Sequence, residues 1–406
     1  MWLYALIAEL IHRLLAPLAP RDRWLGKVHA DSRRWKNLPP RSGRTLWLHC
    51  ASLGEFEMAR PTLEAFLDRH PKWTAVVTFF SPSGFEPRRH YPRAEVFYLP
   101  PDAPSAARHW LHYCRPTLAV FVRYDLWPHH LRALRQQGVP TAVIAFSAPR
   151  TPWYLRRSLP LLRRTVVQAV TLWGTVSEAD SRVLSAAGVH STVLGNPKFD
   201  DALERAATPA SPRFEAWKKA QQRPVLLVGS AHRQDIVAVL GSKEVQRYSV
   251  WIVPHKVDLP LSDLVSSHWP SGLASPLVCK STTDSPQDTG VLLIPEFGLL
   301  ASLYALADVV FIGGGFGKSP HNVLEATAHG KVAACGPHWK GASENPWLRE
   351  NNWLHPVSNE REWSEFLTAH ANGHWTTAAL SAREELQKQR GASERIVRAL
   401  EQAVEL

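Results

Sequence analysis

The sequence predicts an α/β protein made of two doubly wound domains, each with a parallel sheet covered by helices, and a cleft between them. Three observations carry this prediction. With 406 residues the chain is too long for one ordinary hydrophobic core and about right for two domains. Short apolar, β-branched runs alternate with helical patterns through almost the whole chain. A break rich in Pro and charge at residues 207–224 divides this alternation into two halves.

The candidate strands are continuous apolar runs, which suit parallel strands buried on both faces by crossover helices. In the first half these runs are 45–50, 74–80, 95–100, 118–124, 141–146 and 170–176. In the second half they are 225–230, 249–255, 290–295, 308–314 and 332–336. We therefore expect a membrane-associated N-terminal segment over residues 1–40, a first domain over 41–206 and a second domain over 207–406, whose last helix can cross back to the first.

The net charge is strongly positive and is concentrated near the N-terminus. The chain has 47 Lys and Arg against 36 Asp and Glu, a formal net charge of +11. Residues 1–44 alone hold nine basic and three acidic side chains, which is 9 − 3 = +6. Such an excess indicates an anionic partner, which is nucleic acid, a phospholipid surface or a phosphorylated substrate. Because no segment combines these cations with base-stacking aromatics in a known motif, we expect no nucleic-acid partner.

The first 20 residues predict an amphipathic helix and not a membrane-spanning one. One face is apolar at helical spacing, and Glu9, His12 and Arg13 share the other face. A spanning helix needs roughly 20 largely apolar residues, which these three interrupt. We favour a helix that lies in the bilayer interface over one packed on the protein's own core, because basic residues follow it. The candidates for contacts to anionic headgroups are Arg33, Arg34 and Lys36.

Motifs for a disulfide framework, a metal or a nucleophile are missing from the sequence. The four Cys residues, at 50, 114, 279 and 335, are too widely spaced for a zinc or disulfide framework, so we expect reduced thiols in a cytoplasmic compartment. The sequence also lacks a G-x-S-x-G elbow, an H-E-x-x-H pair and clustered metal ligands. We therefore expect no metal and no bound cofactor.

A glycine-rich turn follows a predicted strand in the run FIGGGFGKSPHNVLEATAHG, residues 311–330. The spacing fits neither the P-loop nor the dinucleotide-binding fingerprint. A turn of this kind lets a phosphate approach backbone N–H groups where a helix begins, and Glu325 is placed to accept from sugar hydroxyls. The alternative is a tight turn without a ligand, with Asn322 and Glu325 as capping residues. The residues alone leave both interpretations open.

Two further turns at strand ends in the second half carry polar side chains. Ser230 and His232 follow one strand, and His255 and Lys256 follow the next. Ligands of open α/β sheets bind beyond the carboxyl ends of the strands, so three such turns in one sheet favour a nucleotide site. A single His at the end of a strand is more often an ordinary surface residue. The prediction of a nucleotide site therefore rests on the three turns together.

The first half offers one candidate carboxylate, Glu55, in the stretch HCASLGEFEMARP. Ser52 and Glu55 have the spacing of a helix capping box, in which the Ser caps the helix and the Glu reaches back. A catalytic carboxylate at the mouth of an α/β sheet has the same pattern. On these residues alone the capping interpretation is favoured.

Six segments together resemble the 3-deoxy-D-manno-octulosonic acid (Kdo) transferases, lipopolysaccharide enzymes with the GT-B fold. They occur in the order found in that family and run through most of the chain. They are SLGE (52–55), TFFSPSG (78–84), YDLW (124–127), GNPKFD (195–200), VPH (253–255) and GGGFGKSPHNVLEA (313–326).

The resemblance implies that the first domain holds a lipid A precursor and the second holds CMP-Kdo. It implies transfer of Kdo to a 6-hydroxyl with inversion and without a divalent metal, with Glu55 as the general base. A capping geometry can hold this base, so the two interpretations of Glu55 are compatible. On the acceptor side, the residues in matching positions are Ser52, Gly54, Ser83, Asp125 and Lys198. On the CMP-sugar side they are Ser230, His255, Lys256, Gly314, Gly315, Gly317, Asn322 and Glu325.

The sequence departs from the family pattern at two of these places. Asp125 stands where Glu is usual, and Ala231 stands where a Thr commonly follows the Ser. The embedded acceptor implies a location at the cytoplasmic face of the bacterial inner membrane, with anionic lipids as a partner. Two rival functions remain: another GT-B enzyme, such as a UDP-sugar transferase or epimerase, and a non-catalytic basic protein of the membrane surface.

Overall fold

The computed structural model describes residues 6, 8–10, 20, 24–148, 150–256, 259–271 and 274–405. Most of the predicted N-terminal helix therefore lies outside the described residues. Within the described part, no helix combines the length and the apolar character needed to cross a membrane. The chain divides into two compact units, Met1–Asp201 with Gly391–Leu406, and Ala202–Arg390.

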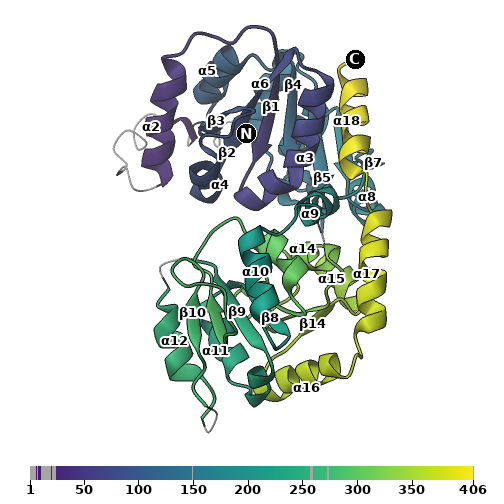
Figure 1. The fold of residues 1–406 in the computed structure, drawn as a ribbon. Helices are drawn as coiled ribbons and strands as arrows, with labels where there is room; N and C mark the ends of the chain where they lie inside the picture. Colours follow the sequence, from purple (N-terminus) through teal and green to yellow (C-terminus); the bar gives the residue numbers. More distant parts are fainter. Residues whose placement is uncertain are drawn as a thin grey trace. The chain divides into compact units, whose positions relative to one another are not determined.

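In the described part of the first unit, seven parallel strands form one sheet in the order β3-β2-β1-β4-β5-β6-β7 (Figure 1). The strands are β1 (Arg44–Cys50), β2 (Trp73–Phe79), β3 (Glu95–Tyr98), β4 (Leu118–Val122), β5 (Thr141–Phe146), β6 (Leu172–Thr175) and β7 (Thr192–Val193). The helices are α2 (Trp24–Lys36), α3 (Leu53–Arg69), α4 (Pro82–Arg88), α5 (Pro104–Cys114), α6 (Pro128–Gln136), η3 (Trp153–Leu155), α7 (Pro160–Ala169), α8 (Glu178–Ala186) and α18 (Ala392–Ala403). Helix α9 (Lys198–Ala206) begins in this unit and ends in the next.

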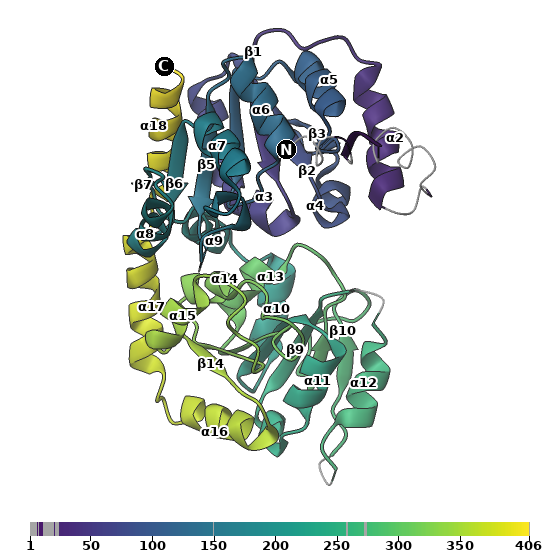
Figure 2. The ribbon, with the colours of Figure 1, turned by 180° about the vertical axis from the view of Figure 1, so that it is seen from behind.

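Two hydrophobic cores cover the two faces of the first sheet. Along β1, successive side chains point to opposite faces. Trp47 packs into the core formed with α5, α6 and α7, whereas Leu46 and Leu48 pack into the core formed with α3 and α18. Figure 2 shows α5, α6 and α7 side by side on one face of this sheet.

The C-terminal helix α18 belongs to the first unit because both its start and its apolar face are held there. The carboxylate of Asp200 accepts hydrogen bonds from the backbone N–H groups of Gly391 at 2.7 Å and Ser393 at 2.6 Å. Ile396 and Val397 are fully buried in the core with α3. On the surface, Arg69 of α3 pairs with Glu394 at 2.7 Å.

The described part of the second unit contains a sheet of seven parallel strands in the order β10-β11-β9-β8-β12-β13-β14. The strands are β8 (Val225–Ala231), β9 (Ser249–Pro254), β10 (Val278–Lys280), β11 (Val291–Leu293), β12 (Val309–Ile312), β13 (Ala333–Cys335) and β14 (Leu354–Pro356). The helices are α10 (Pro212–Ala220), α11 (Arg233–Leu240), η4 (Lys243–Arg247), α12 (Leu261–His268), α13 (Leu300–Leu303), η5 (Tyr304–Leu306), α14 (Val323–Ala328), α15 (Asn345–Glu350), α16 (Glu360–Ala371) and α17 (Thr376–Lys388).

All the strands expected from the sequence are confirmed, and three short ones, β7, β10 and β14, were not expected. All three lie at sheet edges. In each sheet the strand order reverses at the centre, between β1 and β4 in the first unit and between β8 and β12 in the second. Such reversals are where open α/β sheets bind ligands, because the loops that follow the two strands run in opposite directions and leave a crevice.

Candidate active site

Glu55 lies at the reversal point of the first sheet, in the turn that joins β1 to α3. The Ser52 backbone is extended, with φ −145° and ψ 172°, and its side chain makes no capping hydrogen bond. The Oε2 atom of Glu55 accepts a hydrogen bond from the backbone N–H of Ala51 at 2.5 Å. The reciprocal capping box is therefore not formed. Glu55 accepts from Ala51 and not from the N-cap residue Ser52, so neither half of the box exists, but this bond fixes the carboxylate over the end of β1.

The environment of Glu55 raises the pKa of its carboxyl group. Burial is the largest cause, and the nearby negative charge of Asp125 acts in the same direction. The N–H of Ala51 and the charges of His49 and Arg123 act against this shift. A carboxylate with a raised pKa is a better proton acceptor than an ordinary surface glutamate.

Asp125, three residues after the end of β4, is held in place by a chain of hydrogen bonds that leads to buried side chains. The Oδ2 atom of Asp125 lies 2.9 Å from Nε2 of His49 and accepts from the indole N–H of Trp127 at 3.2 Å. Nδ1 of His49 lies 3.0 Å from the Thr78 hydroxyl, which accepts from the indole N–H of Trp47 at 2.9 Å. The backbone carbonyl of Thr78 also lies 3.2 Å from Nδ1, so the hydroxyl and the carbonyl of Thr78 together orient the imidazole toward Asp125. The fold brings His49 and Asp125 close enough to Glu55 for their charges to act on it. Of these two residues, only Asp125 was predicted from the sequence.

Arg123 is a second group near Glu55 that the sequence analysis missed. It directly follows β4 and has a left-handed backbone with φ +64°, which is uncommon for a residue with a side chain. Its Nε atom is buried and has no hydrogen-bond partner among the described residues. Strained backbone and an unpaired buried donor at a strand end are features of binding sites, and the left-handed φ is not visible in the sequence.

The other predicted acceptor-side residues, Gly54, Ser83 and Lys198, lie at the starts of three different helices. Gly54 is exposed at the start of α3, and a Cβ added to it would meet no atom within 4 Å. Ser83 is exposed in α4, whose N-cap residue Ser81 donates its backbone N–H to the Ala51 carbonyl at 2.9 Å. Lys198 begins α9, where the side chain of Asn196 accepts from its backbone N–H at 3.1 Å. The structure thus joins the β1 and β2 turns directly, and the role of Lys198 stays a prediction.

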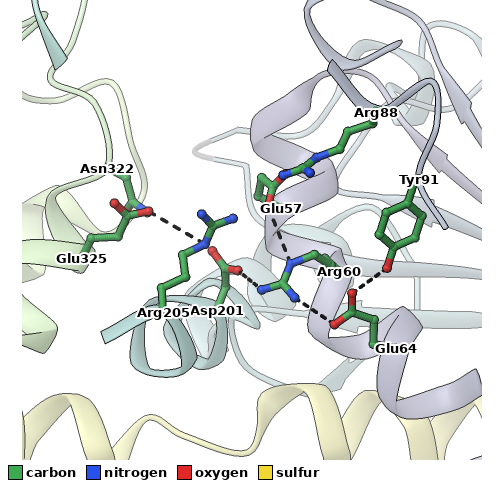
Figure 3. Close-up of polar contacts among 9 residues, drawn as sticks. All are labelled: Glu57, Arg60, Glu64, Arg88, Tyr91, Asp201, Arg205, Asn322 and Glu325. Atoms are coloured by element: carbon green, nitrogen blue, oxygen red, sulfur yellow. Dashed lines mark hydrogen bonds and ion pairs between the residues drawn. The ribbon is translucent and has the colours of Figure 1, made fainter. Parts of the chain in front are cut away.

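An ion-pair network around Arg60 fixes the helix that carries Glu55. Arg60, on α3, pairs with Glu64 at 2.8 Å and with the buried Asp201 of α9 at 2.8 Å (Figure 3). Glu57 pairs with both Arg60, at 3.6 Å, and Arg88 of α4. Because three elements share this network, α3 is held firmly one turn beyond Glu55.

In the second unit, the glycine-rich turn lies at the reversal point between β8 and β12, as expected. A Cβ on Gly313 would come within 2.4 Å of the Ser230 carbonyl oxygen, and one on Gly315 within 2.6 Å of the Gly336 nitrogen. Gly314 has a left-handed φ of +97°. Ser230 has φ +50°, a second left-handed residue at a strand end. The close approach of these backbones is therefore one reason for the glycines.

The N–H groups of this turn hold a carboxylate of the protein itself, that of Asp235. Its Oδ2 atom accepts from the backbone N–H groups of Gly314 and His232, each at 2.9 Å, and the N–H of Phe316 also stabilises the charged form. Burial is the largest influence and raises the pKa of Asp235. Gly317 donates its N–H to the Gly314 carbonyl at 3.0 Å. A phosphate that used the Gly314 amide would therefore compete with Asp235, a residue that the sequence analysis did not single out.

Three imidazoles form a histidine cluster, His232, His255 and His321, at the ends of β8 and β9 and in the turn before α14. The His255 ring stacks on His232 with centroids 4.5 Å apart and on His321 at 4.4 Å. The Nε2 atoms of His232 and His321 lie 3.1 Å apart, so one donates to the other. Burial, together with the charges of the other two rings, lowers the pKa of His321 to about 4; burial, His232 and Lys256 lower that of His255. Both are therefore neutral near pH 7.

This cluster can accept either an anion or a metal ion. One nitrogen from each ring lies within 4.8 Å of the others, and it is the one group of three possible metal ligands found in the described part of the chain. Neutral imidazoles suit zinc, copper or nickel. They also suit a phosphate, because they supply N–H donors and take up protons when an anion approaches. Exposed Lys256 follows His255 directly and adds a positive charge.

Asn322 and Glu325 lie one helical turn apart at the start of α14, and Glu325 is oriented by its neighbours. The Asn322 amide donates to Oε1 of Glu325 at 3.1 Å, and Arg205 of α9 lies 4.0 Å from the same oxygen (Figure 3). Asn322 is the N-cap residue, but its side chain makes no capping bond. Its Oδ1 atom is buried without a hydrogen-bond partner among the described residues. The Asn322 side chain therefore does not cap the helix, and its Oδ1 is available to a ligand hydroxyl.

The predicted headgroup cations differ in what they contact. Arg34 donates to the Val96 carbonyl, lies 3.4 Å from Asp31 and covers the Phe97 ring with its guanidinium 4.2 Å from the ring centroid. Lys36 is exposed at the end of α2. The Arg33 side chain lies outside the described atoms. Of the two described side chains, Lys36 is exposed with its ammonium 5.6 Å from the centroid of the Trp35 ring, and Arg34 stabilises the contact of α2 with β3.

Comparison with known proteins gives matches to sequence relatives across most of the chain. A family model described as "3-Deoxy-D-manno-octulosonic-acid transferase (kdotransferase)" matches residues 24–201. A 3-deoxy-D-manno-octulosonic acid transferase of Bordetella pertussis is 28% identical over 80% of this chain and 81% of its own length. One of Chlamydophila psittaci is 26% identical over 75% of this chain and 72% of its own.

Solved structures with the same fold are more distant in sequence. A glycosyltransferase of Rickettsia africae matches with a TM-score of 0.59 at 10% identity, over 90% of this chain and 99% of the other. MurG of Acinetobacter baumannii matches with a TM-score of 0.54 at 12% identity, over 88% and 99%. At such low identity the likeness shows the fold alone, two parallel-sheet α/β domains of GT-B type, as the sequence predicted.

Proposed function

Because this chain is a glycosyltransferase of the Kdo transferase family, we propose that it moves Kdo from CMP-Kdo to the 6-hydroxyl of a lipid A precursor in lipopolysaccharide biosynthesis. We propose further that the transfer inverts the anomeric centre and that Glu55 is the general base. The single observation that carries the mechanism is the fixed, half-buried carboxylate of Glu55 at the reversal point of the first sheet.

In the proposed step, Glu55 takes the proton of the acceptor hydroxyl while the oxygen bonds to the anomeric carbon of Kdo. The bond from that carbon to the CMP phosphate oxygen breaks at the same time, and CMP leaves with the bonding electrons. The raised pKa of Glu55 supports this role, as does the Ala51 N–H, which holds one oxygen and leaves the other for the substrate. Asp125 and Arg123 set the local potential at the same strand ends.

For the donor, we propose that the histidine cluster and Lys256 meet the CMP phosphate, while Asn322 and Glu325 meet sugar hydroxyls. The stacked imidazoles and the buried, unpaired Oδ1 of Asn322 support this assignment. Asp235 already occupies the amides of Gly314 and His232, which is a reason to assign the phosphate to the side chains first. Ser230, Gly315 and Gly317 complete the predicted donor side.

We propose that the reaction needs no metal, since imidazole and ammonium groups can stabilise the departing phosphate. The requirement for a metal must be tested, because the three imidazoles of the histidine cluster are also suitable ligands for zinc or nickel. EDTA should leave the rate of transfer unchanged. A loss of activity that added Zn²⁺ restores would show that the cluster works through a metal.

The direct test is to incubate the purified protein with CMP-Kdo and a tetra-acylated lipid A precursor and to measure product masses. We expect a mass increase of one or more Kdo units and release of CMP. CMP should also protect the fold against heat more than UDP does. Protection by UDP alone, with no product, would favour the rival UDP-sugar transferase or epimerase. Absence of product and of any nucleotide effect would favour a non-catalytic protein.

The proposed acceptor requires contact with a membrane, and we place the protein at the cytoplasmic face of the inner membrane. The charge of +6 over residues 1–44 supports anionic lipids as a partner. Replacing Arg33, Arg34 and Lys36 by Gln should weaken binding to anionic liposomes in a salt-dependent way. Unchanged binding would remove these three residues from the membrane contact.

A further inference from the structure

A second basic region of the chain lies far from the N-terminus and contains no acidic residue. Residues 126–177 hold no Asp, Glu or Lys and seven Arg, a net charge of +7. The seven are Arg132, Arg135, Arg150, Arg156, Arg157, Arg163 and Arg164. With the +6 of residues 1–44, the two regions exceed the net charge of the whole chain, +11, so the remainder is slightly acidic.

Three of these arginines line one cavity on the surface of the first unit. Arg132 and Arg135 extend from α6 and Arg164 from α7, around a cavity of about 590 Å³. Leu161 and Thr165 complete one wall of it, and no carboxylate is among its lining residues. All three arginines are exposed, and none has an ion-pair partner in the described part of the chain. A cluster of like charges without counter-ions raises the local positive potential and attracts an anion.

Large apolar side chains are exposed beside the cavity. The exposed fractions are 53% for Trp153, 40% for Leu159 and 65% for Leu161. Arg156 and Arg157 lie between Trp153 and Leu159 in the sequence, and both are exposed. Trp and Leu mixed with Arg is the composition of surfaces that enter the headgroup region of a bilayer, where apolar atoms reach the acyl chains and cations meet phosphates.

The cavity lies on the same face of the first sheet as the described part of the N-terminal helix. Helices α5 and α6 pack together, as do α6 and α7 (Figure 2). Glu9 accepts from the backbone N–H of Ser105 in α5 at 3.2 Å, which holds residues 8–10 against that helix. Leu6 and Leu10, one helical turn apart, are 52% and 55% exposed. Apolar groups at both ends of one helical layer thus face solvent.

We propose that α6, α7 and the loop with Trp153 form a lipid-docking surface, and that the cavity of Arg132, Arg135 and Arg164 binds the phosphate of an anionic phospholipid headgroup. This deepens the proposed function, because an embedded acceptor demands a docked enzyme, but lipid binding can be measured without turnover. Helix α6 begins directly after Asp125–Trp127, so docking through it places the bilayer beside the acceptor side of the same unit. Exposed leucines distinguish this surface from a nucleic-acid groove, which would present stacked aromatics.

The test compares two variants with equal loss of charge. One is Arg132→Gln/Arg135→Gln/Arg164→Gln, and the control is Arg247→Gln/Arg361→Gln/Arg383→Gln, at exposed positions of the second unit. The full-length proteins are floated with phosphatidylcholine vesicles, with and without added phosphatidylglycerol. Thermal unfolding is recorded for both, and the exposed sites predict little change in unfolding temperature.

The first variant should lose about tenfold or more of its affinity for the phosphatidylglycerol vesicles, because each cation near the surface contributes separately. The control should lose about threefold or less, because its charges are not part of the proposed docking surface and contribute only to the general positive potential. Leu161→Ser should lower the part of the binding that persists at high salt. Equal loss in both triple variants, or unchanged binding in the first, would overturn the proposal. So would loss of oligonucleotide binding without loss of vesicle binding, which would assign the surface to nucleic acid.

Discussion

At the residue scale, the pKa of Glu55 depends on a neighbour that can be neutralised without removing its hydrogen bonds. In Asp125→Asn, the amide oxygen can still accept from His49 and Trp127, but the negative charge is lost. Since that charge raises the pKa of Glu55, the acid limb of the pH–rate profile should move to lower pH. It should remain above the range of an exposed glutamate, because burial is the larger cause. A limb that stays in place or moves upward would show that Glu55 is not the titrating base.

The histidine cluster makes a second pH prediction at this scale. Since His255 and His321 are neutral near pH 7, an anion that binds beside them should draw a proton onto the cluster. Affinity for the methyl ester of CMP, whose phosphodiester carries one fixed charge, should therefore rise as the pH falls from about 8 to about 6. Calorimetry in two buffers of different ionisation enthalpy should show proton uptake, reduced in His321→Asn. Binding without proton uptake would place the phosphate elsewhere.

The sequence indicated some of the residues of these clusters and could not indicate others. Glu55, Asn322 and Glu325 belong to short contiguous motifs, which can be recognised in the sequence without the structure. Arg123 depends on a left-handed backbone, and Asp235 on the approach of two loops from different strands. The sequence pattern does not show either feature. The order of strands in the sheet decides which loops meet, and the fold imposes the backbone angle of Arg123. The capping pattern of Ser52 was misleading for the same reason: Glu55 reaches Ala51, while Ser52 caps nothing.

At the scale of elements, the long strands were predictable and the short edge strands were not. Central strands are buried on both faces and read as continuous apolar runs, whereas β7, β10 and β14 have two or three residues each. A strand of two or three residues forms because the neighbouring strand offers backbone hydrogen-bond partners. It is too short to show a periodic pattern of apolar residues in the sequence. The expected boundary at residue 206 falls at the end of α9, five residues after the division of the two units at 201, because α9 runs through it.

Helix α18 offers a prediction at the element scale, because it ties the C-terminus to the first unit. Ile396→Ala removes a fully buried side chain and should destabilise this unit by about 2–5 kcal/mol. Arg398→Ala, on the exposed face of the same helix, should have little effect. Amide exchange in α3 and β5 is the suitable measurement, because it reports on the first unit separately from the second. Unchanged exchange in Ile396→Ala would show that α18 is not part of the first core.

At the scale of the whole molecule, the fold class was predictable from the chain length and from the alternation of strand and helix patterns. The distribution of positive charge on the surface was not predictable from the basic N-terminal residues alone. Basic side chains are dense in residues 1–44, whereas the arginines of residues 126–177 are fewer for their length and are separated by strand β5, which carries none. Only the fold places Arg132, Arg135 and Arg164 around one cavity. Both basic regions lie in the first unit, where the embedded acceptor is expected.

The most direct test of the central claim is a single-turnover measurement on Glu55→Gln with CMP-Kdo and the lipid A precursor. The rate of transfer should fall by about 10²–10⁴-fold, the usual contribution of a general base. Affinity for CMP should stay as in the wild type. The raised pKa means that ionised Glu55 opposes folding above that pKa, so the Gln variant should unfold at the same or a higher temperature near pH 7. A stable Gln variant that transfers Kdo at close to the wild-type rate would contradict the account.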